Sequence, residues 1–178
     1  MAVMLGIGFL SSLIAVLVLM PYFIRWLKKK RVNQKVSEYS LQEYKEKEKT
    51  PVMGGLLFIF APIVVTALCQ HDFWQDRALL LVMAEFVCFG LIGFTDDWLI
   101  VTQSNNIGLK PWQKLMLQTI FAILFIVCMG SRLPHEVHIP FMHVSLKLGS
   151  GYILLAMLMF TGSSNAVNLT DGMDGLAA

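Results

Sequence analysis

Five long stretches that are almost free of charge constrain the fold of this chain more than any other feature. A helix needs roughly 17–25 mostly apolar residues to cross a bilayer. Such stretches occupy residues 1–24, 52–70, 78–95, 115–131 and 148–170, and only Glu85 in the third is charged. Charged residues are 15% of the 178, against about 25% in soluble domains. We predict an all-α, polytopic membrane protein with about five spans, forming a single membrane domain over residues 1–178.

The distribution of basic residues sets the expected orientation. Cytoplasmic loops of membrane proteins carry an excess of Lys and Arg. Nine of the 14 Lys and Arg residues lie between the first and second stretches, and only Arg77 lies between the second and third. This predicts an outside N-terminus and an inside C-terminus. The basic residues follow the first stretch, whereas a cleavable signal peptide carries them in front, so we expect the first stretch to be a span.

The segment between the fourth and fifth stretches has a different pattern. Residues 135–146 alternate polar and apolar side chains, which is the period of a half-exposed strand. Pro140 suits a turn or an edge position. We predict a short external β-hairpin. Its three histidines are interpreted as surface residues rather than a metal site, because Glu136 is the one carboxylate nearby and the segment has no Cys.

Asp96 and Asp97 end the third stretch, on the side predicted to be cytoplasmic. Adjacent residues on a helix point about 100° apart, so either the helix ends here or the two carboxylates have different roles. Two acids at a helix C-terminus oppose the helix dipole, which favours a function over a solvated helix end. Clustered carboxylates bind Mg²⁺ in phosphoryl chemistry. A carboxylate can instead act as a base on an attacking group.

A second polar cluster follows the fifth stretch, on the same predicted face. Asn165, Asn168, Asp171 and Asp174 recur every three residues, so a helix would place them on one side. Amides and carboxylates of this kind can coordinate a cation or hydrogen-bond a nucleobase or ribose. Polar clusters at a membrane boundary are costly and indicate a functional site. We therefore predict an enzyme that acts on a charged, phosphorylated substrate at the cytoplasmic face.

Two single residues leave alternatives open. Lys114, at the start of the fourth stretch, can meet a phosphate, but alone it suits a snorkelling membrane anchor. Glu85 lies well inside the third stretch, where an ionised carboxylate is expensive. We expect Glu85 to make a structural hydrogen bond to a neighbouring helix rather than to act in catalysis.

Four stretches match a known family, and they occur in the family's order. They are Thr50-Pro-Val-Met-Gly-Gly, Phe89-Gly-Leu-Ile-Gly-Phe-Thr-Asp-Asp, Asn106-Ile-Gly-Leu with Lys114-Leu, and Asn165-Ala-Val-Asn-Leu-Thr-Asp-Gly-Met-Asp-Gly-Leu-Ala. On these motifs the chain resembles the bacterial phospho-N-acetylmuramoyl-pentapeptide transferases, a family of the polyprenyl-phosphate N-acetylhexosamine-1-phosphate transferase superfamily. The Asn-Leu-Thr-Asp sequence resembles the muramyl branch more than the N-acetylglucosamine branch.

The resemblance implies a reaction and its partners. Phospho-MurNAc-pentapeptide would pass from UDP-MurNAc-pentapeptide to undecaprenyl phosphate, giving lipid I and UMP. The resemblance further implies Mg²⁺ as cofactor, a multi-pass enzyme of the bacterial plasma membrane with a cytoplasmic active face, and frequent homodimers. It implies no nucleic-acid partner. Family members are roughly ten-helix proteins, so this chain would be the N-terminal half, and we expect it to be inactive alone.

The resemblance also assigns roles to individual residues. Asp96 and Asp97 would form the catalytic acid pair, one as the base that deprotonates the lipid phosphate and the other organising the metal and the diphosphate. Asp171 is a further catalytic candidate, and the expected metal ligands are Asp97 and Asp171. The expected substrate-binding residues are Lys47, Lys114, Asn165, Asn168 and Asp174.

The chain departs from the family pattern at several positions. Ile100 stands where a Lys is usual, and Lys49 stands where a Gly usually precedes the Thr-Pro pair. Val52 replaces a second Thr, and Tyr44 stands where a His is common. These departures bear most on the role assigned to Lys47.

Three alternative functions stay open from sequence. The first is a related transferase that moves GlcNAc-1-phosphate to the same lipid. The second is a non-catalytic membrane fragment. The third is a cation carrier or channel, which would place polar residues near the bilayer midplane, where only Glu85 approaches.

Overall fold

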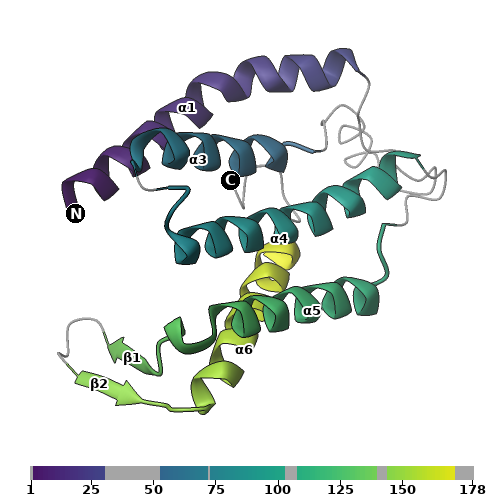
Figure 1. The fold of residues 1–178 in the computed structure, drawn as a ribbon. Helices are drawn as coiled ribbons and strands as arrows, with labels where there is room; N and C mark the ends of the chain where they lie inside the picture. Colours follow the sequence, from purple (N-terminus) through teal and green to yellow (C-terminus); the bar gives the residue numbers. More distant parts are fainter. Residues whose placement is uncertain (1, 31–52, 72, 103–107, 140–143, 171–178) are drawn as a thin grey trace. The chain divides into compact units, whose positions relative to one another are not determined.

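The computed structural model describes residues 2–30, 53–71, 73–102, 108–139 and 144–170. The chain divides into two compact units, Met1–Pro111 and Trp112–Ala178, and each unit is described by itself. All five apolar stretches are helices within the described residues, and a small hairpin precedes the last helix (Figure 1). The predicted helical membrane architecture with a short β-hairpin is confirmed.

The first unit contains α1 (Ala2–Lys29), α3 (Gly55–Cys69) and α4 (Arg77–Thr102). Helix α3 packs against both of its neighbours and lies between them (Figure 1). Helices α3 and α4 meet at Gly90, where a Cβ atom would collide with the Ile59 side chain. Any larger residue at this position would require the Ile59 side chain to move.

Helix α4 begins at a side-chain cap and continues beyond the acid pair. Asp76 Oδ1 accepts hydrogen bonds from the N–H groups of Ala78 at 2.9 Å and Leu79 at 3.1 Å. The cap satisfies donors that have no partner within the first turn. Because the helix runs on to Thr102, the alternative in which it ends at Asp97 is wrong.

The second unit contains α5 (Pro111–Met129), a 3₁₀ turn at Gly130–Arg132, the strands β1 (Glu136–Ile139) and β2 (Val144–Lys147), and α6 (Gly151–Thr170). The strands pair antiparallel, with β1 starting opposite the end of β2. This confirms the predicted hairpin. Pro140, expected at its turn, lies outside the described residues.

Helices α5 and α6 cross each other and are joined by side-chain contacts (Figure 1). Phe125 on α5 meets Phe160 on α6 edge to face, with ring centroids 5.3 Å apart. Gln118, two turns earlier on α5, meets Asn165, which is later on α6. Gln118 and Phe125 of α5 thus contact Asn165 and Phe160 of α6 where the two helices cross.

Three of the described helices are long and apolar enough to cross a membrane by length and composition: Gly6–Lys29, Arg77–Thr102 and Pro111–Arg132. Helix α3 and the Gly151–Val167 part of α6 are apolar but shorter. Large apolar side chains are exposed along all five helices, as expected for surfaces that contact lipid. The chain is a multi-pass membrane protein.

Candidate active site

The acid pair is held by two different segments of backbone. Asp97 Oδ2 accepts a hydrogen bond of 3.0 Å from the backbone N–H of Met53, the residue that leads into α3. Asp96 Oδ1 accepts one of 2.7 Å from the backbone N–H of Leu109, on the segment before α5. Both carboxylates are half-buried. Successive helix positions thus point at different neighbours, so each carboxylate is oriented by its own backbone donor.

Met53 adopts an unusual backbone conformation to make its contact. Its φ is +71°, in the left-handed region, and it is the only non-glycine residue with a positive φ in the described ranges. Its side chain is buried, at 7% exposed. A left-handed non-glycine residue costs about 1–3 kcal/mol and persists only where its surroundings hold it. The strained residue is the one whose N–H donates to Asp97, so the backbone strain occurs at the contact with the acid pair.

Gly108 lets the other backbone segment reach Asp96. A Cβ atom at Gly108 would collide with the Asp96 carboxylate. Any larger residue would displace either that carboxylate or the turn that delivers the Leu109 N–H. By contrast, a Cβ at Gly54 or Gly55 would meet nothing within 4 Å.

The described part of the second unit contains three more of the predicted site residues. Lys114 is half-buried in the first turn of α5. Asn165 on α6 donates from Nδ2 to Gln118 Oε1 at 2.7 Å and to the Thr161 carbonyl at 2.8 Å. Asn168 lies in the last turn of α6, where the structure describes the backbone alone.

Three predicted site residues, Lys47, Asp171 and Asp174, lie outside the described residues. No group of three or more His, Cys, Asp or Glu side chains comes together in the part of the chain that the structure describes. Adjacent carboxylates oriented by backbone N–H groups are suitable oxygen ligands for Mg²⁺, which commonly takes one or two carboxylates together with substrate phosphates and water. The donor set at Asp96 and Asp97 therefore fits this ion.

In the described ranges, Glu85 does not make the hydrogen bond predicted for it at one of its two carboxyl oxygens. It is 7% exposed on α4, and its Oε1 has no hydrogen-bond partner among the described residues. The structural hydrogen bond predicted for this carboxyl is therefore absent at that oxygen within the described part of the chain. An unpaired buried polar atom costs about 1–3 kcal/mol.

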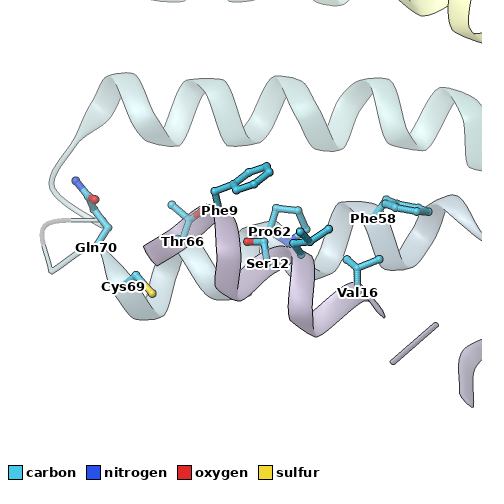
Figure 2. Close-up of a pocket in the computed structure, with 10 residues that line it drawn as sticks. Phe9, Ser12, Val16, Phe58, Pro62, Thr66, Cys69 and Gln70 are labelled. Atoms are coloured by element: carbon cyan, nitrogen blue, oxygen red, sulfur yellow. The ribbon is translucent and has the colours of Figure 1, made fainter. Parts of the chain in front are cut away.

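A separate cavity of about 430 Å³ lies between α1 and α3. Figure 2 shows Phe9 and Val16 of α1 on one side and Phe58 and Pro62 of α3 on the other. Ser12, Thr66 and Gln70 are its polar side chains, and no charged residue lines it. The cavity offers nothing to a phosphate or a metal ion, so we do not assign it to the phosphoryl site.

Sequence reasoning missed the backbone donors of the site and one buried amide. Met53 and Leu109 contribute through main-chain N–H groups, which leave no mark in side-chain chemistry. Gln118 is buried at 2% exposed and bonds two α6 side chains. The sequence does indicate Gln118, because it is the one side-chain amide in the apolar stretch 115–131.

Comparison with known proteins places these residues in a family. The model of a family described as "Glycosyl transferase family 4" matches residues 79–178. The chain is 40% identical over 175 residues to the phospho-N-acetylmuramoyl-pentapeptide-transferase of Staphylococcus aureus strain bovine RF122 / ET3-1, covering 94% of this chain and 54% of that protein. The proteins of the same name from strains JH9 and Newman match to the same extent. The chain spans about half the length of the curated relatives it matches.

Proposed function

Because the chain belongs to glycosyl transferase family 4, we propose that it forms the N-terminal half of a phospho-N-acetylmuramoyl-pentapeptide transferase. The proposed reaction moves phospho-MurNAc-pentapeptide from UDP-MurNAc-pentapeptide to undecaprenyl phosphate. The products are lipid I and UMP. The proposed setting is the bacterial plasma membrane, with the acid pair at the cytoplasmic face.

One observation carries this proposal. Two neighbouring carboxylates in the last third of α4 are oriented independently, Asp97 by Met53 and Asp96 by Leu109. A solvated pair of helix-end acids would need no such backbone donors. Two carboxylates with fixed and different directions are what a phosphoryl transfer needs when one group serves the nucleophile and the other serves the diphosphate.

In the proposed mechanism, a phosphate oxygen of the lipid attacks the phosphorus that carries MurNAc. A new P–O bond forms to the lipid phosphate, and the bond from that phosphorus to the UMP oxygen breaks. One aspartate of the pair holds the proton of the lipid phosphate if that phosphate arrives protonated. Lys114 would lie near the diphosphate, where its charge offsets the charge on the leaving UMP.

Magnesium is proposed as the cofactor, with Asp97 and Asp171 as its protein ligands. When bound, Mg²⁺ would compensate charge on the diphosphate oxygens. The Met53 N–H fixes one oxygen of Asp97, so the direction of that carboxylate is set by the chain itself. Asn168, Asp174 and Lys47 remain proposed substrate-binding residues, and a homodimer remains a prediction.

A transfer assay in detergent tests the proposal. The full 178-residue chain is assayed alone and after co-expression with the remaining C-terminal part of the S. aureus relative. Each preparation receives undecaprenyl phosphate, Mg²⁺ and either labelled UDP-MurNAc-pentapeptide or labelled UDP-GlcNAc. We expect label to enter the lipid phase from the muramyl donor in the co-expressed preparation. Transfer from UDP-GlcNAc alone, or no transfer in any arm, would contradict the proposal.

A further inference from the structure

A buried polar network joins α5 to α6, and the mechanism above makes no use of its central residue. Gln118 is 2% exposed in the middle of an apolar helix. Its Nε2 donates to Ser164 Oγ at 2.9 Å, and its Oε1 accepts from Asn165 Nδ2 at 2.7 Å. Burying an amide is costly unless its polar atoms are bonded. Gln118 meets this requirement with two consecutive residues of α6.

The backbone carbonyl of Thr161 determines which atom donates and which accepts in every hydrogen bond of the network. Asn165 Nδ2 also donates to the Thr161 carbonyl at 2.8 Å. A carbonyl oxygen can only accept, so the Asn165 atom that faces it must be the amide nitrogen. The same nitrogen faces Gln118, which must therefore present Oε1 to Asn165 and Nε2 to Ser164. The usual uncertainty over amide orientation is thereby removed.

The network leaves the side-chain oxygen of Asn165, Oδ1, as a hydrogen-bond acceptor for a ligand. Both protons of its amide are engaged, one by Gln118 and one by Thr161. Its Oδ1 accepts no hydrogen bond from the described residues. Asn165 is therefore a fixed acceptor that offers no donor, and it can bind an N–H or O–H group of a ligand.

The network also lies beside other candidate substrate-binding residues. Lys114 precedes Gln118 by one turn of α5, about 6 Å along the axis, and residues at this spacing share a helix face. Asn168 follows Asn165 in the last turn of α6. Lys114 and the backbone of Asn168 therefore each lie about one helical turn from the network, Lys114 on α5 and Asn168 on α6.

We propose that Gln118 is a positioning residue for the donor substrate: it holds the Asn165 amide so that Asn165 Oδ1 accepts a hydrogen bond from the nucleotide sugar. The donor group is an N–H or O–H of that substrate, from either its nucleotide part or its sugar part. This inference rests on the proposed function and deepens it. Gln118 itself need not touch substrate.

Two substitutions separate positioning from mere packing. Gln118→Met keeps the length and removes both hydrogen bonds. Gln118→Glu keeps one oxygen to accept from Asn165 and a second to accept from the Ser164 hydroxyl, although a buried acid lowers stability. Thr119→Val is the matched control, because Thr119 Oγ1 donates to the Leu115 carbonyl of its own helix.

Kinetics in the preparation that transfers give the first readout. We expect Gln118→Met to raise KM for UDP-MurNAc-pentapeptide about three- to tenfold, which corresponds to the loss of one hydrogen bond to the substrate. The KM for undecaprenyl phosphate should be unchanged. Gln118→Glu should keep the donor KM within about twofold while its melting temperature falls. Thr119→Val should change neither quantity. A rise in the inhibition constant of UMP for Gln118→Met would assign the contact to the nucleotide, and an unchanged constant would assign it to the sugar part.

A second readout observes the network without any activity. The chain has five asparagines, so ¹⁵N-asparagine labelling gives five side-chain amide signals, and Asn165→Asp identifies one of them. We expect the Asn165 amide protons to be protected from solvent exchange in the wild type and in Gln118→Glu, and unprotected in Gln118→Met. A donor KM that follows melting temperature across the three variants, or that stays constant when protection is lost, would overturn the positioning role. Absence of transfer by the wild type would overturn the proposed function and this role with it, while the exchange data still report the network.

Discussion

The backbone N–H of Met53 donates a 3.0 Å hydrogen bond to Asp97 Oδ2 across 44 residues of sequence. The donor comes from a residue with a φ of +71°, and the acceptor comes from the last third of α4. The contact ties the turn before α3 to the acid pair. A separate segment ties Asp96 through Leu109, so the two acids are oriented independently.

Gly108 should be intolerant of any side chain. In Gly108→Ala, the new Cβ would collide with the Asp96 carboxylate and displace it. Misplacement of a reacting group by about 1 Å can cost up to 100-fold, so we expect transfer to fall about 10- to 100-fold with little change in melting temperature. Gly93→Ala on α4, where a Cβ meets nothing within 4 Å, is the control and should retain activity. Near-normal transfer by Gly108→Ala would show that this close approach is not needed.

The crossing of α3 and α4 at Gly90 should depend on Ile59. Gly90→Ala would drive a Cβ into the Ile59 side chain, and such overpacking typically costs about 1–3 kcal/mol. Ile59→Val removes the Cδ1 atom that is struck, so the double variant should recover most of the loss. Melting temperatures of the two single variants and the double variant measure this coupling. Additive effects would contradict it.

Replacing Glu85 should stabilise the protein. The buried Oε1 has no partner among the described residues, and an apolar residue of similar volume avoids that cost. We expect Glu85→Leu to raise the free energy of unfolding by about 1–2 kcal/mol with transfer within about twofold of wild type. Unfolding free energies and transfer rates of Glu85→Leu and Glu85→Gln test this prediction. Loss of transfer in Glu85→Leu together with reduced transfer in Glu85→Gln would show that the carboxyl is functional and would contradict it.

The predicted orientation places the hairpin outside and the end of α1 inside. In a chain whose Cys69, Cys88 and Cys128 have been replaced, single cysteines at the exposed Ser145 and Lys30 report the two sides. We expect a membrane-impermeant maleimide to label Ser145→Cys in intact cells and Lys30→Cys only after permeabilisation. The opposite pattern would place the acid pair on the outer face and would contradict the proposed setting.

Much of the fold could be predicted from apolar stretches, because lipid-facing helices must satisfy their backbone internally and expose apolar side chains. The alternation of polar and apolar side chains over residues 135–146 also predicted the hairpin that β1 and β2 form. The end of α4 could not be predicted. The stretch 78–95 stops at the acids, whereas the helix continues through Trp98 and Ile100 to Thr102, since apolar residues resume after the pair.

The candidate site was predictable only where side chains carry the chemistry. Asp96 and Asp97 were evident from their charge beside an apolar run. The donors that orient them, at Met53 and Leu109, are backbone groups brought close by tertiary packing, and no residue type encodes such a contact. Gln118 is intermediate, because a lone amide in an apolar helix suggests a partner without saying which one.

The most direct test of the central claim compares Asp→Asn at the two ends of α4. Asp97→Asn keeps an oxygen that can accept from Met53 N–H, so it removes charge without removing the contact. Asp76→Asn is the matched control, because Asn caps a helix as well as Asp does. With UDP-MurNAc-pentapeptide, undecaprenyl phosphate and Mg²⁺, we predict that Asp97→Asn lowers transfer about 10²- to 10⁴-fold while Asp76→Asn stays near wild type. Transfer by Asp97→Asn within a few-fold of wild type would contradict the claim that this pair is the catalytic centre.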